Sequence, residues 1–116
     1  MISIVDYGMG NLRSVEKGLA SQGAEVRLTR DADEIMNSDG LVLPGVGAFG
    51  DCVKNLDKFS LIEPIKEFIK SGKPFLGICL GLQVLFEKSE ESPEETGLSV
   101  FKGKVVKFPV YEQKGL

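Results

Sequence analysis

The sequence predicts an α/β protein with an open, mostly parallel sheet and helices on both faces. Short runs of β-branched and apolar residues alternate with segments of helical periodicity. These runs are apolar at consecutive positions, which is typical of parallel strands that are buried on both faces. The 116 residues are 42% hydrophobic and 27% charged, which suits one soluble domain with its own core.

The first part of the chain contains three of the expected strands. The helix between the first two has Leu12, Val15 and Leu19 on one face, and Gly23 suits its C-terminal end. We therefore expect, in order, a strand over 2–6, a glycine-rich turn over 7–11, a helix beginning at Leu12, a strand over 24–28, a short helix or turn over 31–36 and a strand over 40–43.

The second part continues the alternation. Ser60 and Glu63 have capping-box spacing and should open a helix that ends at 71–72, with Pro74 just beyond. The helix after the fourth strand should face inward with Leu82, Leu85 and Phe86. We expect a glycine-rich loop over 44–50, a short helix around Val53 and Leu56, the helix with Ile62, Ile65 and Ile69 on one stripe, a strand over 74–78, a helix over 80–88, an acidic loop over 89–97, an exposed antiparallel strand or hairpin over 100–108 and a polar tail over 111–116.

Composition excludes several classes of function. Lys and Arg number 14 and Asp and Glu 17, a net charge of −3 without a basic block, so we expect no nucleic-acid partner. No apolar stretch approaches the roughly 20 residues that a bilayer requires, and no signal peptide is visible, so we expect no membrane partner. Two isolated cysteines without a CxxC motif indicate free thiols in the cytoplasm.

The chain contains no histidine. Any Ser–His–Asp or Cys–His mechanism made only of these residues is therefore excluded. Two cysteines are too few ligands for a structural zinc site, and we expect neither a metal nor a cofactor.

A cysteine stands in the centre of Gly77-Ile78-Cys79-Leu80-Gly81, between a predicted strand and a predicted helix. This is the pattern of a nucleophile elbow with cysteine in place of serine. The glycines remove side chains that would clash around a strained central residue, and the helix N-terminus favours thiolate. We expect the N–H of Leu80 to be free for a developing oxyanion. The alternative is a buried structural cysteine that lies between glycines.

The loop Pro44-Gly45-Val46-Gly47 follows a neighbouring strand. Ligands of open α/β sheets bind at the carboxyl ends of the strands. Its exposed backbone N–H groups predict a second oxyanion donor, from Val46 or Gly47. The alternative is a tight turn that needs glycine conformations.

Other candidate sites are weaker. The turn Gly8-Met9-Gly10-Asn11 lacks the Lys-Ser/Thr of a phosphate loop, and Arg13 occupies the final glycine position of GxGxxG. We interpret Cys52 as a small, partly buried core residue. The acidic pairs at 90–91 and 94–95 are interpreted as a solvated loop, and Lys102, Lys104 and Lys107 as the wet face of a strand.

Four segments together resemble a known family. They are Gly77-Ile78-Cys79-Leu80-Gly81-Leu82-Gln83, Asp6-Tyr7-Gly8-Met9-Gly10-Asn11-Leu12 with Ser14-Val15, Leu43-Pro44-Gly45-Val46-Gly47-Ala48-Phe49-Gly50 and Leu82-Gln83-Val84-Leu85-Phe86-Glu87 with Ser89-Glu90-Glu91. The first resembles the nucleophile signature of class I (triad) glutamine amidotransferases. The others are similar to those of the glutaminase subunits of imidazole glycerol phosphate synthase. The resemblance covers residues 1 to about 108.

The resemblance implies a flavodoxin-like fold and a reaction. Cys79 would attack the side-chain amide of glutamine, a thioester would form with loss of ammonia, and water would release glutamate. The ammonia would pass to a partner cyclase subunit, a (β/α)₈ barrel, with Asn11 near that partner. The resemblance assigns oxyanion stabilisation to Leu80 and Val46, and glutamine binding to Gly45, Gly47 and Gln83.

The sequence departs from the family in one respect. The family's catalytic His and Glu lie near the end of a domain of ~200 residues. Residues 1–116 are therefore expected to be a partial domain, its amino-terminal three-fifths, inactive as a glutaminase by itself. Such a part should expose apolar surface and an open strand edge, and should self-associate. The alternative function is a non-catalytic α/β binding or interaction module that retains the elbow only for structure.

Overall fold

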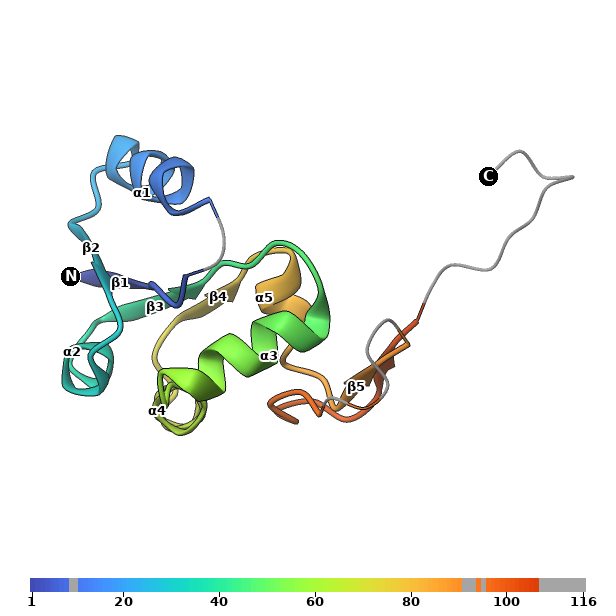
Figure 1. The fold of residues 1–116 in the computed structure, drawn as a ribbon. Coiled ribbons are helices and arrows are strands. Elements are labelled where there is room, and N and C mark those ends of the chain that lie inside the picture. The colour runs from blue at the N-terminus through green and yellow to red at the C-terminus, as the bar shows by residue number, and fades with distance from the viewer. Residues whose placement is uncertain (9–10, 91–93, 95, 107–116) are drawn as a thin grey trace, which may run out of the picture.

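Four short apolar runs pair into one parallel sheet. The computed structural model describes residues 1–8, 11–90, 94 and 96–106. The strands are β1 (Ile2–Val5), β2 (Val26–Thr29), β3 (Gly40–Leu43) and β4 (Phe75–Gly77), in the order β2-β1-β3-β4 (Figure 1). All three neighbouring pairs are parallel, with Ile4 opposite both Leu28 and Val42. The predicted open parallel sheet is confirmed.

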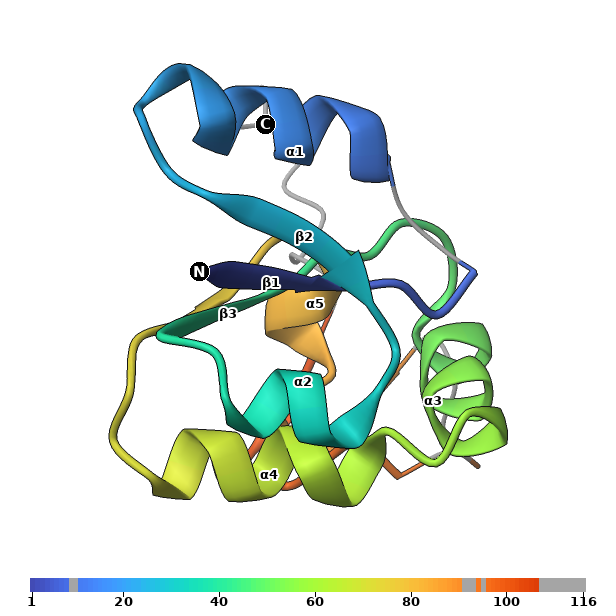
Figure 2. The ribbon, with the colours of Figure 1, turned by 90° about the vertical axis from the view of Figure 1, so that its left-hand side faces the viewer.

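Helices cover both faces of the sheet. Figure 2 shows α1 (Leu12–Ser21) on one side and α2 (Ala32–Met36) and α4 (Ile62–Lys70) on the other, with α3 (Phe49–Lys58) beside them. The second side holds the main core, because its helices bury apolar side chains against the sheet. That core includes Val5, Leu41, Leu43, Ile35, Phe49, Leu56, Ile65 and Phe68.

The other face is covered unevenly. Leu28, Ile4, Val42 and Leu76 form one row across the four strands. Ile4 is 0% and Val42 3% exposed, but Leu76, on the edge strand β4, is 51% exposed. An apolar groove of about 170 Å³ lies here, lined by Leu19 of α1 and by residues of β3 and β4 that include Leu76. The expected exposed apolar surface and open edge are confirmed for the described residues.

The prediction of a capping box at Ser60 is wrong. Ser60 has a positive φ of 56° and ends α3 instead of opening α4. Its N–H donates to the carbonyl of Asp57, and the N–H of Leu61 donates to that of Leu56. These two bonds form a Schellman motif with Ser60 in the position that glycine usually occupies. The N-cap of α4 is Leu61, which has no side-chain cap.

The helix predicted over 80–88 is much shorter, and only α5 (Leu80–Gln83) forms. The carbonyls of the two residues after α5 accept hydrogen bonds from a later part of the chain. Leu98 N–H donates to Val84 O, and Val100 N–H donates to Leu85 O. A long-range pairing therefore replaces the next helical turn. Leu85 is buried as predicted, but Leu82 is 50% exposed, so its inward orientation is wrong.

The strand expected over 100–108 is also corrected. Only β6 (Lys104–Val105) forms, and it pairs with β5 (Lys88–Ser89) in a separate two-stranded sheet. The pairing is parallel, not antiparallel, because the connecting segment crosses over after bonding to 84–86. Residues 107–108 and the tail 111–116 lie outside the described residues.

Candidate functional site

Cys79 lies at the junction between the edge strand and a turn of helix. β4 ends at Gly77 and α5 begins at Leu80. Cys79 has φ 54° and ψ −118°, a backbone conformation that side-chain-bearing residues rarely adopt. Its thiol is free and the residue is exposed. These are the properties expected of an elbow that presents a nucleophile, and they exclude the alternative of a buried structural cysteine.

The two flanking glycines are required by packing. A Cβ on Gly77 would lie 2.8 Å from the carbonyl oxygen of Gly81. A Cβ on Gly81 would overlap the carbonyl oxygen of Leu43, at the end of β3. The elbow thus folds back on its own strand and against the neighbouring one, which leaves room only for hydrogen at both positions.

The glycine loop touches the elbow through one backbone hydrogen bond. Leu80 N–H donates to the carbonyl of Gly45 over 3.1 Å. Because a trans peptide is planar, the N–H of Val46 then points the opposite way from that carbonyl. The expectation that Leu80 N–H is free is wrong for this conformation, because the nearby carbonyl supplies an acceptor.

The remaining predicted site residues are divided between the loop, α5 and α1. Val46 is 53% exposed, and Gly47, also exposed, has a positive φ of 95°. Gln83 ends α5, is half-buried, and its N–H donates to the carbonyl of Cys79 over 3.3 Å. Asn11 is exposed at the N-cap of α1, where its side chain makes no capping bond. The bond between Leu80 and Gly45 joins the loop to the start of α5, next to Cys79.

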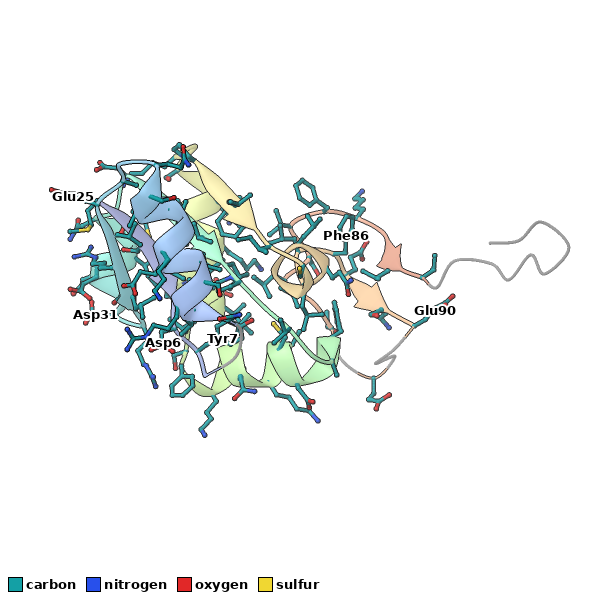
Figure 3. All side chains as sticks on the ribbon, turned by 90° about the horizontal axis from the view of Figure 1, so that it is seen from above. Asp6, Tyr7, Glu25, Asp31, Phe86 and Glu90 are labelled. Carbon is teal, nitrogen blue, oxygen red and sulfur yellow. The ribbon has the colours of Figure 1, made fainter. Side chains whose placement is uncertain are left out.

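A buried tyrosine supports the loop from behind, and the sequence did not single it out. Tyr7 is 0% exposed and its hydroxyl donates to the carbonyl of Pro44 over 2.5 Å. The hydroxyl also lies 3.2 Å from Sγ of Cys52, which is completely buried in α3. The parallel register offers a signal: Ile4 pairs with Val42, so residues just beyond β1 and β3 must be neighbours. Figure 3 shows Asp6 and Tyr7 together beyond β1, far from Phe86 and Glu90.

Burial disfavours the charged form of both members of this pair. Desolvation raises the pKa of the Tyr7 hydroxyl above its usual range, and the bond to Cys52 raises it further. Desolvation also raises the pKa of the Cys52 thiol to about 11, although its hydrogen bond with Tyr7 opposes this. Both groups are therefore protonated at neutral pH.

Surface features add little chemistry. Glu90 and Glu94 are exposed, as expected of a solvated acidic loop, and their neighbours at 91 and 95 lie outside the described residues. In the described ranges, three or more His, Cys, Asp or Glu side chains nowhere gather as metal ligands would. None of the helices described there has the length and apolarity to cross a bilayer.

Comparison with known proteins identifies relatives that match almost the whole of this chain. The protein named imidazole glycerol phosphate synthase subunit HisH from Caldanaerobacter subterraneus subsp. tengcongensis is 58% identical over 109 residues, which are 94% of this chain and 54% of that protein. Its namesake from Aquifex aeolicus is 55% identical over 108 residues, 92% of this chain and 52% of that protein. The chain thus spans about half the length of these relatives, less than the expected three-fifths.

Solved structures share the fold. A crystal structure titled as a glutamine amidotransferase superposes with a TM-score of 0.72 at 21% identity, over 86% of this chain and 53% of that one. A putative peptidase E from Listeria monocytogenes EGD-e superposes with a TM-score of 0.62 at 15% identity, over 74% of this chain and 49% of that one.

The family model described as glutamine amidotransferase class-I matches residues 3–115. This chain belongs to the class I glutamine amidotransferase family.

Proposed function

We propose that the chain is the nucleophile-bearing part of a glutaminase that supplies ammonia to a cyclase subunit of imidazole glycerol phosphate synthase in the cytoplasm. The observation that carries the proposal is the exposed Cys79 thiol on a strained elbow, beside a glycine loop. The names of relatives at 55–58% identity support the choice of imidazole glycerol phosphate synthase and therefore of a cyclase partner. Asn11, exposed at the start of α1, is assigned to the interface with the cyclase barrel.

The chemistry assigned to these residues is acyl transfer. Sγ of Cys79 forms a bond to the side-chain amide carbon of glutamine, and the carbon–nitrogen bond breaks as the nitrogen leaves as ammonia. Water then attacks the thioester, so glutamate forms and the thiol returns. Gly45, Gly47 and Gln83 are assigned to glutamine binding. Proton transfer is assigned to a group outside these 116 residues, because they contain no histidine.

The assigned oxyanion donors require a backbone rearrangement. Leu80 N–H is engaged by the Gly45 carbonyl, and the N–H of Val46 belongs to that same peptide unit. Rotation of the Gly45–Val46 peptide would release the first donor and redirect the second. This rotation changes ψ of Gly45, where the absence of a side chain permits it, and φ of Val46.

A matched pair of probes tests the proposal. The chloroketone analogues of L- and D-glutamine have the same intrinsic reactivity, so a rate difference at Cys79 measures recognition. We expect the L form to alkylate Cys79 faster, and free L-glutamine to protect. Equal rates would overturn the assignment of glutamine binding and favour the non-catalytic module. Labelling of Cys79 before Cys52 is not sufficient, since Cys52 is inaccessible.

A rate measurement tests the role of the absent residues. The 116-residue chain alone should release ammonia from glutamine at least 10²-fold more slowly than an enzyme with an acid/base partner. Release at a rate typical of enzymes would contradict the assignment of proton transfer to a group outside the chain.

A further inference from the structure

Tyr7 lies where three parts of the site's support meet. Its hydroxyl bonds to the carbonyl of Pro44 in the loop, and to Sγ of Cys52 in α3. A Cβ on Gly45 would lie 2.7 Å from this hydroxyl and 3.0 Å from the backbone nitrogen of Gly81. Gly45 is therefore enclosed between the Tyr7 hydroxyl on one side and the elbow on the other.

The hydrogen bonds have a defined direction. The Pro44 carbonyl can only accept, so the single Tyr7 proton is donated to it. The Cys52 thiol is then the donor to the phenol oxygen. Burial raises the pKa of Tyr7, which maintains this arrangement through the physiological pH range.

Burial changes abruptly along the loop. Pro44 and Gly45 are buried, whereas Val46 is 53% exposed and Gly47 is exposed. The Pro44 carbonyl, fixed by Tyr7, belongs to the peptide immediately before the one that engages Leu80. The fixed and the free parts of the loop therefore meet at Gly45.

We propose that Tyr7 is a positioning residue for the glutaminase site: by fixing the Pro44 carbonyl, it confines the rotation that frees Leu80 N–H to the single peptide Gly45–Val46. This inference rests on the proposed function. Without the hydroxyl, the Pro44–Gly45 peptide also turns, and the loop loses the alignment that glutamine and its oxyanion require. The opposing interpretation is a core tyrosine that contributes only stability.

Tyr7→Phe tests the inference, because it removes the hydroxyl and retains the ring. We expect the ratio of L- to D-analogue alkylation rates at Cys79 to fall about tenfold, since small misplacements of catalytic groups have large effects. The D-analogue rate should stay within twofold of wild type, because the thiol remains exposed. Hydrogen exchange at the Leu80 amide should accelerate relative to that at Ile65 in α4.

Ile35→Val, in the core beneath the sheet, is the matched control for lost stability. It should leave the ratio unchanged. An unchanged ratio in Tyr7→Phe would overturn the inference, as would an equal slowing of both enantiomers, which indicates a purely structural role. If wild type itself shows no enantiomer preference, the proposed function has failed instead. Slow exchange at Leu80 in a folded Tyr7→Phe variant would also count against Tyr7.

Discussion

Leu80 N–H and the carbonyl of Gly45 form a 3.1 Å hydrogen bond that joins the elbow to the glycine loop. The bond satisfies a donor at the start of α5 that would otherwise lack an intrahelical partner. It also occupies the donor that family resemblance assigns to the oxyanion. In the described conformation this donor is therefore engaged by the protein's own backbone.

Substitution of Gly81 by alanine should destabilise the fold. Its Cβ would overlap the Leu43 carbonyl oxygen, and backbone on both sides has to move. We expect a loss of about 2–4 kcal/mol in the free energy of unfolding, measured by urea denaturation. Gly18→Ala is the matched control, because Gly18 lies within α1 with nothing within 4 Å of the added Cβ. That variant should gain about 0.5–1 kcal/mol.

Ser60→Gly should stabilise the protein by about 1 kcal/mol, because glycine adopts positive φ without the steric cost that serine has. The shift in thermal midpoint would measure this. A capping box predicts the opposite sign, a loss of a few tenths of a kcal/mol. A lowered midpoint would therefore contradict the Schellman motif at this position.

Stability should fall as pH rises above 9. The thiol of Cys52 titrates at 9.0 when exposed and at about 11 in the folded protein. Between these values the unfolded state binds fewer protons, so the free energy of unfolding decreases with pH, by at most about 1.4 kcal/mol per pH unit from this group. Below pH 9 the contribution is complete.

Denaturation in urea at pH 8, 9 and 10 measures this slope. Cys52→Ala removes the thiol and should flatten the slope, leaving the part due to Tyr7, whose raised pKa acts with the same sign. An identical slope in Cys52→Ala would show that other groups cause the alkaline loss.

The chain alone should self-associate through the exposed end of the apolar row. Leu76 is half-exposed on the edge strand β4, beside the apolar groove. Sedimentation should show an apparent mass that increases with protein concentration. The Leu76→Lys substitution should reduce this increase. Val106→Lys, at a residue of similar exposure, should not. A compact monomer over a wide concentration range would contradict this expectation.

The strands could be predicted because each is a local apolar run. The third, over 40–43, matches β3, and the fourth differs from β4 by one residue at each end. The second is displaced by one to two residues, since Thr29 pairs with Val5 despite being polar. The strained backbone of Cys79 also follows from local sequence, because glycines flank it on both sides.

Most of the errors involve partners distant in the chain, and the one at Ser60 is local. Nothing near Val84 or Leu85 indicates that Leu98 and Val100 will bond to their carbonyls. The Ser60–Glu63 spacing is local, but the end of α3 determines how Ser60 is used. The contact between Tyr7 and Pro44 likewise needs the register of β1 and β3, which the pattern alone does not specify.

The position of β4 at the edge of the sheet has an energetic consequence for the nucleophile. This strand has three residues and pairs along one side only, with β3, in the described part of the chain. Edge segments with few cross-strand bonds open at lower cost than central ones. The free energy needed to open β4 therefore determines how firmly the orientation of Cys79 is held. Any strand that pairs along the free edge of β4 would make the thiol more rigidly placed without touching it.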